Sequence, residues 1–129
     1  MKLLADTSII IALIAGEEHT KIAELIKNHQ LCCSSSIHAE VGNAISAMFK
    51  QKRITLAQAT EIIKNFEQLS FEIITFDLHR SIQISHQYQI YAYDAYVLEC
   101  AHRHHLPLMT LDNLMKEKAK QLKISLTEV

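Results

Sequence analysis

Short apolar runs alternate along the chain with longer stretches in which apolar residues recur at helical spacing. The compact apolar runs predict strands at 2–5, 31–34, 71–75 and 108–110, with 124–126 as a further candidate. The helical spacing predicts helices over 9–15, 19–29, 37–50, 55–67, 78–88, 92–103 and 113–122. Strands that alternate with helices indicate an α/β fold, with a mostly parallel sheet covered on both faces.

Residue types at the ends of these segments support the helix boundaries. Thr7 and Ser8 are of N-cap type and precede the first helix, and Gly16 suits its C-cap. Thr55 is a plausible N-cap for the helix that follows it. Because no repeat, linker or low-complexity segment interrupts the pattern, we expect a single domain over residues 1–129.

Composition narrows the class of protein. With 49% apolar residues, 2 glycines and 1 proline in 129 residues, the chain is typical of a compact helix-rich protein. No apolar stretch approaches the roughly 20 residues that span a bilayer, and the apolar N-terminal run lacks a signal-peptide pattern. The 3 cysteines, Cys32, Cys33 and Cys100, suggest buried free thiols. We therefore expect a cytoplasmic protein without a membrane segment.

With a net charge of −1, the chain lacks the strongly basic character of many nucleic-acid-binding proteins. It does not exclude a nuclease, because an acidic metal site cancels basic residues elsewhere in the count. Asp6 sits between two apolar runs, where an unpaired carboxylate would cost several kcal/mol or take up a proton. Asp6 therefore either caps a helix or coordinates a ligand.

Four carboxylates fall at the predicted strand ends or in the first turns of predicted helices: Asp6, Glu40, Asp94 and Asp112. In parallel α/β sheets, ligands bind outside the carboxyl ends of the strands. Each acid also has an ordinary explanation, since Asp6 and Asp112 suit N-caps and first-turn acids gain about 0.3–1 kcal/mol from the helix dipole.

The combination favours a metal site over four separate explanations. Two like charges about 4 Å apart cost roughly 4 kcal/mol at an effective dielectric constant near 20, so such a cluster persists where divalent cations neutralise it. Oxygen ligands select hard ions such as Mg²⁺ or Mn²⁺. Two such ions activate a water molecule and stabilise the leaving oxygen of a phosphodiester.

Four tyrosines gather before and within the helix that carries Asp94: Tyr88, Tyr91, Tyr93 and Tyr96. Aromatic faces stack on unpaired bases in some RNA-binding proteins. Packing in a core or an interface is the commoner use of such residues, and Tyr91 is the strongest exception in this group. Both interpretations stay open from the sequence.

The chain resembles the PIN-domain family and, within it, the VapC-type toxin ribonucleases of toxin–antitoxin pairs. The resemblance runs through essentially the full length, on the segments LLADTSIIIAL, SSSIHAEVGNA and YDAYVLECAHRHHLPLMTLD and on the closing helix. The loop QIYAYDA lacks the glycine often found there in the family, but no catalytic position is affected.

The resemblance implies a three-layer α/β/α fold and metal-dependent endoribonuclease activity. Asp6 and Asp94 would be the core ligands of Mg²⁺, with Mn²⁺ as a substitute. Asp112 would be a second ligand or would orient bound water, and Glu40 would hold a second ion or act through water as a base. Small hydroxyl residues occupy the family's positions beside the site, at Ser8 and Thr110.

The resemblance also implies an RNA substrate, a cognate VapB-type antitoxin and a homodimer whose subunits share an acidic groove. The alternative is a non-catalytic PIN scaffold that binds RNA or a protein. The intact set of four carboxylates argues against it, because a scaffold has no need of mutually repelling charges. A phosphoacceptor signalling domain would require paired acids after the first strand and a lysine after the last, and DTS and MTLDN supply neither.

Overall fold

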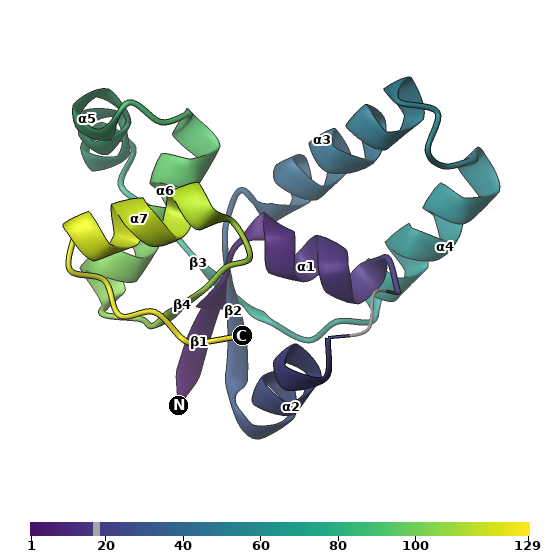
Figure 1. Cartoon of the computed structure of the whole chain (residues 1–129), viewed down its shortest axis with the longest axis horizontal. Helices are drawn as coiled ribbons and strands as arrows, with labels where there is room; N and C mark the ends of the chain where they lie inside the picture. The colour runs from purple at the N-terminus through teal and green to yellow at the C-terminus, as the bar shows by residue number, and fades with distance from the viewer. Residues whose placement is uncertain (17–18) are drawn as a thin grey trace.

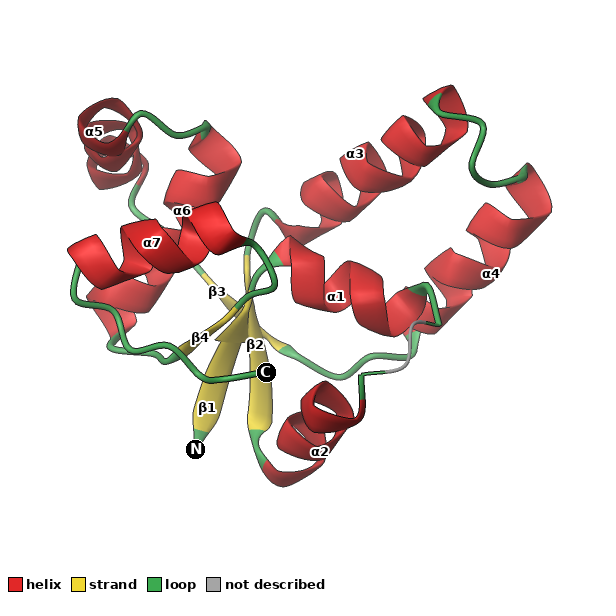
Figure 2. Cartoon of the chain, in the orientation of Figure 1, coloured by secondary structure: helices red, strands yellow, loops and turns green. Residues whose placement is uncertain are grey.

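The computed structural model describes residues 1–16 and 19–129. Its described residues form one parallel sheet in the order β3-β2-β1-β4. Figure 1 and Figure 2 show this sheet between two groups of helices. The strands are β1 (Lys2–Ala5), β2 (Gln30–Ser34), β3 (Glu72–Ile74) and β4 (Leu108–Met109). The helices are α1 (Thr7–Ile14), α2 (Thr20–Asn28), α3 (Ile37–Lys50), α4 (Leu56–Glu67), α5 (Leu78–Tyr88), α6 (Ala92–His104) and α7 (Asn113–Gln121).

Alternate residues of each strand bury themselves in two different cores, because successive side chains of a strand point to opposite faces. Leu4 and Cys32 pack with residues of α5, α6 and α7 on one face. Leu3 and Cys33 pack with residues of α1, α2, α3 and α4 on the other. The helices therefore lie on both sides of the sheet (Figure 1), which confirms the predicted three-layer α/β/α architecture.

The start of the first helix differs from the prediction. Thr7 and Ser8 lie inside α1, and the N-cap is Asp6, whose side chain accepts a hydrogen bond from the backbone N–H of Ile9. The prediction that Thr7 and Ser8 precede the helix was wrong, because β1 ends at Ala5 and the helix begins directly after Asp6; the capping explanation offered for Asp6 is confirmed. Gly16 follows the C-cap residue Ala15 with a φ of 80°, a conformation that glycine adopts without strain.

The other boundaries agree to within a few residues. Thr55 caps α4 through a capping box, as expected. Strand β3 is shorter than predicted because its register pairs it only with Cys32, Cys33 and Ser34. The candidate strand at 124–126 is reduced to a single bridge between Leu108 and Leu126. No helix of the described residues combines the length and the apolar character needed to cross a membrane.

Candidate active site

Asp6 directly follows the central strand β1 and is 5% exposed. Its Oδ1 accepts hydrogen bonds from the Ser8 hydroxyl and, at 3.3 Å, from the backbone N–H of Ile9. Its Oδ2 accepts a hydrogen bond from the Thr110 hydroxyl. Burial raises the pKa of the Asp6 carboxyl, while these donors oppose the rise and the charge of Asp112 adds to it.

The hydroxyls of Ser8 and Thr110 also join the Asp6 region to the segment that follows β4. The backbone N–H of Leu111 donates to Ser8 Oγ at 2.9 Å, and that of Asp112 donates to Thr110 Oγ1 at 3.0 Å. Each hydroxyl therefore accepts a hydrogen bond from the backbone after β4 while it donates one to Asp6. Together they fix the end of β1 against the turn that carries Asp112.

Glu40 lies in the first turn of α3 and is 8% exposed. Its two carboxylate oxygens accept hydrogen bonds from Thr7 Oγ1 at 2.8 Å and from Ser36 Oγ at 2.6 Å. Burial raises the pKa of Glu40, the two hydroxyls lower it, and the charges of Asp6 and Asp94 raise it further.

Thr7 and Ser36 are positioning residues that the sequence analysis missed. In the sequence analysis, Thr7 is treated as a capping residue and Ser36 is assigned no role. The serine run before an acidic first turn was the available signal, because short hydroxyl side chains at a helix entrance often bond nearby groups.

Asp94 lies half-buried in the first turn of α6. Within residues 1–16 and 19–129, its carboxylate has no hydrogen-bond donor and no ion-pair partner. Burial raises the pKa of Asp94, and the charges of Asp112 and Asp6 raise it further. A carboxylate with this combination of burial and free oxygens is suited to bind a cation.

Asp112 is the most exposed of the four acids and forms the N-cap of α7. Its Oδ1 accepts from the backbone N–H groups of Leu114 at 2.8 Å and Met115 at 3.2 Å. Among the described side chains and backbone groups, Oδ2 has no donor. The capping explanation and the ligand explanation therefore use different oxygens of one carboxylate.

Each of the four predicted acids is coupled by charge to at least two of the others. Charge interactions link Asp6 to Asp112, Glu40 to both Asp6 and Asp94, and Asp94 to both Asp6 and Asp112. In the part of the chain that is described, none of the four forms an ion pair with Lys, Arg or His. Nor do any three His, Cys, Asp or Glu side chains there form a preassembled metal-binding group.

These observations fit a site that a divalent cation would complete. The hydroxyl donors hold the carboxylates of Asp6 and Glu40 in place, and a cation would relieve the repulsion among the four like charges. The donor set consists of oxygen atoms alone, which is the set that Mg²⁺ and Mn²⁺ prefer. Asp6, Glu40, Asp94 and Asp112 are the residues that would hold the ion.

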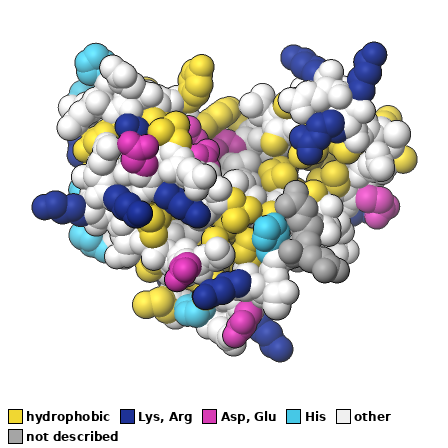
Figure 3. Space-filling view, in the orientation of Figure 1, with side chains coloured by type: hydrophobic (Ala, Val, Ile, Leu, Met, Phe, Trp, Pro, Cys, Tyr) yellow, Lys and Arg dark blue, Asp and Glu magenta, His cyan; other side chains and the backbone are white. Residues whose placement is uncertain are grey.

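A cleft of about 660 Å³ opens beside these acids. Glu40 and Asp94 line it together with Thr7, Asn43 and a group of three tyrosines, Tyr91, Tyr93 and Tyr96. In Figure 3, acidic side chains gather in the hollow between the α6–α7 side of the molecule and the α1–α3 side. The cleft gives a substrate access to Glu40 and Asp94, the two acids that line it.

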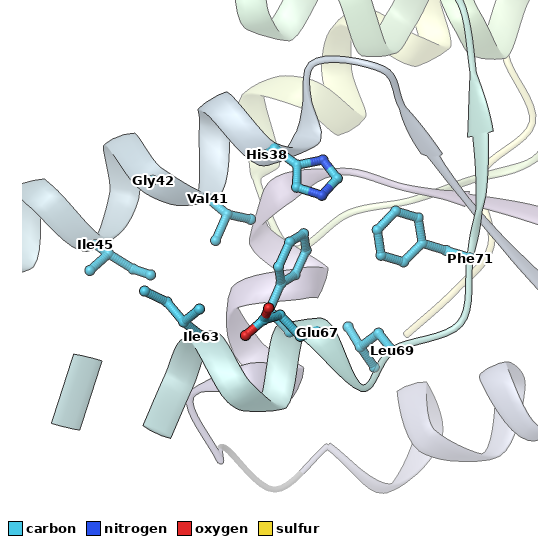
Figure 4. Close-up of a pocket in the computed structure, with 9 residues that line it drawn as sticks. His38, Val41, Gly42, Ile45, Ile63, Glu67, Leu69 and Phe71 are labelled. Carbon is cyan, nitrogen blue, oxygen red and sulfur yellow. The ribbon is translucent and has the colours of Figure 1, made fainter. Parts of the chain in front are cut away.

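A second pocket, of about 570 Å³, lies between α3 and α4 and contains none of the four acids (Figure 4). Its lining is largely apolar and includes Val41, Ile45 and Ile63. His38 packs edge-on against Phe66, with ring centroids 5.2 Å apart. His38 therefore belongs to this pocket, although the sequence places it close to Glu40.

Comparison with known families accounts for this arrangement. The profile of the PIN domain matches residues 3–121, which include all four acids. The chain belongs to the PIN-domain family. PIN domains are generally nucleases.

Solved structures show the same PIN fold. PAE2754 from Pyrobaculum aerophilum is 24% identical with a TM-score of 0.73, covering 92% of this chain and 79% of that one. VapBC2 from Rickettsia felis, solved bound to a DNA fragment from their promoter, is 18% identical with a TM-score of 0.65, covering 99% and 98%. A toxin–antitoxin complex from Klebsiella pneumoniae is 24% identical with a TM-score of 0.55, covering 85% and 86%. Comparison with curated proteins finds no match.

Proposed function

We propose that this PIN domain is a metal-dependent endoribonuclease that hydrolyses RNA phosphodiester bonds. The observation that carries the proposal is a set of four charge-coupled acids with no cationic partner in the described residues, two of which, Glu40 and Asp94, line an open cleft. Such repulsion has no structural benefit. It becomes useful where a cation and a phosphate must both be bound.

Each acid has a role that follows from its surroundings. Asp94, with its free oxygens, and Asp6, held by two hydroxyls, are the core ligands. Asp112 offers Oδ2 as a further ligand or as an acceptor that orients water. Glu40, held by Thr7 and Ser36, binds a second ion or accepts a proton through water. A bound Mg²⁺ or Mn²⁺ would activate water and stabilise the leaving oxygen.

The decisive experiment compares RNA cleavage by the wild type with that by Asp94→Asn. A mixed cellular RNA pool is incubated with Mg²⁺ or Mn²⁺, and discrete cuts are expected for the wild type alone. The cuts should disappear in EDTA. Glu61→Gln is a matched control, because its side chain is 71% exposed on α4 and does not line the cleft. Equal cutting by Asp94→Asn would contradict the proposal.

The alternative is a PIN scaffold that binds RNA or protein without cutting it. Thermal unfolding with and without the metal ion distinguishes this scaffold from the nuclease. An ion that binds only the folded state adds about 2.7 kcal/mol at a hundredfold excess over its dissociation constant. For 129 residues this corresponds to a rise in Tm of roughly 10 °C. No shift with Mn²⁺ would favour the non-catalytic module.

We further propose that the protein is the toxin of a VapBC-type pair and is inhibited by an antitoxin in the cytoplasm. The relatives that carry the names VapBC2 and toxin–antitoxin complex support this proposal. The antitoxin would lay a segment across the apolar surface of the early helices and reach the acids with a basic side chain. The apolar pocket between α3 and α4 offers such a surface. An antitoxin complex whose inhibitor stays far from Asp6 and Asp94 would contradict it.

A homodimer with a shared acidic groove completes the proposed assembly. Two copies would place two clefts side by side and extend the surface available to an RNA. Sedimentation of the purified chain tests this directly, and a monomer at every accessible concentration would rule the dimer out.

A further inference from the structure

One wall of the carboxylate cleft is aromatic, and the hydrolytic chemistry makes no use of it. Tyr93 meets Tyr96 edge-on, with ring centroids 5.9 Å apart. Tyr96 in turn stacks on Phe76 at 4.0 Å with an interplanar angle of 12°. This row of rings runs from the loop before α5 to the first turn of α6, next to Asp94. It supplies a firm aromatic support beside the acids.

Tyr91 stands apart from that row at the entrance of the cleft. It occupies the N-cap position of α6 and is 87% exposed, yet it lines the same cleft as Glu40 and Asp94. Within residues 1–16 and 19–129, its ring contacts no other ring and its hydroxyl has no hydrogen-bond partner. The faces of the Tyr91 ring are therefore open to a ligand that enters the cleft.

The backbone beneath Tyr91 is held in place on its N-terminal side. The neighbouring residue Ile90 is 8% exposed, and its N–H donates to the Ser85 carbonyl at 3.1 Å. The Ser85 hydroxyl donates back to the Ile90 carbonyl at 2.6 Å. The ring is therefore presented from an anchored backbone, which lowers the entropy lost when a ligand orders it.

We propose that Tyr91 stacks on an unpaired nucleobase beside the phosphodiester that the acids address. The inference rests on the proposed function and adds to it a residue of this chain that binds a base. A base in a duplex is covered on both faces by its neighbours, whereas an unpaired base offers a free face to an aromatic ring. Asn43, which lines the same cleft, supplies both a donor and an acceptor to the edge of such a base.

The chain carries its own optical probe for this contact. It has no tryptophan, and all 4 of its tyrosines lie between residues 88 and 96. A short oligouridylate is titrated into the protein in Ca²⁺, and tyrosine fluorescence is followed. We expect quenching by the unpaired strand and much weaker quenching by the same strand annealed to oligoadenylate.

Three variants distinguish the contribution of the Tyr91 ring from that of its hydroxyl and from general effects of a surface substitution. Tyr91→Leu should weaken binding of oligouridylate about tenfold, within the range for the loss of one stacked base. Tyr91→Phe keeps the ring and should bind within about twofold of the wild type, a difference well below that loss. Leu56→Ser is the matched control, because Leu56 is 74% exposed on α4, outside the cleft.

Cleavage kinetics give a second readout. Tyr91→Leu should raise KM for a single-stranded RNA about tenfold and change kcat little, since stacking is the same before and during the reaction. Wild-type affinity in Tyr91→Leu, or equal binding of duplex and single strand, would overturn the inference. So would a change in sedimentation with unchanged affinity, which would assign Tyr91 to an interface between copies. A wild type that neither binds nor cuts RNA would overturn the proposed function itself.

Discussion

Replacing Thr110 by valine tests how the site is held together. Thr110 is 1% exposed, and its hydroxyl donates to Asp6 Oδ2 while it accepts the backbone N–H of Asp112 at 3.0 Å. Valine has almost the same shape and can do neither. Thr110→Val therefore removes two hydrogen bonds at once and leaves both partners in place.

The expected cost follows from these two bonds. A hydrogen bond to a charged group contributes about 1.5–3 kcal/mol and one between neutral groups about 0.5–1.5 kcal/mol. Their loss should lower the free energy of unfolding by roughly 2–4 kcal/mol. For a chain of 129 residues, this lowers Tm by roughly 7–15 °C. Thr110→Ser keeps the oxygen, loses one methyl group and should cost only about 1 kcal/mol.

Thermal and urea unfolding near neutral pH in EDTA measure the difference, with Thr110→Ser as the matched control. Thr110→Val should also lower RNA cleavage, because Asp6 loses one of the groups that orient it. If valine and serine lowered the stability equally, the hydroxyl would not be a structural partner of Asp6. A valine variant more stable than the wild type would refute the reasoning outright.

Three further predictions concern charge and capping. The pKa values of three acids are raised above the ordinary 3.8 of Asp or 4.5 of Glu: Asp6, Glu40 and Asp94. The folded state keeps protons on these carboxyls at pH values where the unfolded chain has released them. The free energy of unfolding therefore falls as the pH rises above the ordinary pKa values. The metal-free protein should therefore melt at a higher temperature at about pH 5 than at about pH 7, and Mg²⁺ should reduce the difference; a flat profile in EDTA would contradict this. Thr55→Ala breaks a capping box and should lower the free energy of unfolding by about 1 kcal/mol, measured in urea against Thr60→Ala, an exposed site on the same helix. Glu99→Gln removes the charge of a 2% exposed carboxylate that accepts from Arg103 Nε at 2.8 Å and from the Asp77 backbone N–H at 3.0 Å, and should cost about 1–3 kcal/mol in the same assay; unchanged stability would show that this charge contributes little.

The sequence by itself determined the alternation of elements and the positions of the four acids relative to them. Helical periodicity is a local property of the sequence, and it predicted α3 and α5 with the observed ends. A parallel sheet places the carboxyl ends of all its strands at one edge, which predicts that Asp6 and Asp112, the acids that follow β1 and β4, lie at the same edge.

Only the tertiary structure decided how each acid is held. The hydroxyl donors to Asp6 and Glu40 include residues 104 and 33 positions away in the chain, Thr110 and Thr7. No local pattern reveals such partners, because a hydroxyl side chain bonds whatever the fold brings within reach. The same holds for β3, which ends where its neighbour β2 stops pairing. The residue types and their places along the chain were enough to predict the four acids. The packing of the folded chain determined which donors hold them, and it left Asp94 without a donor among the described residues.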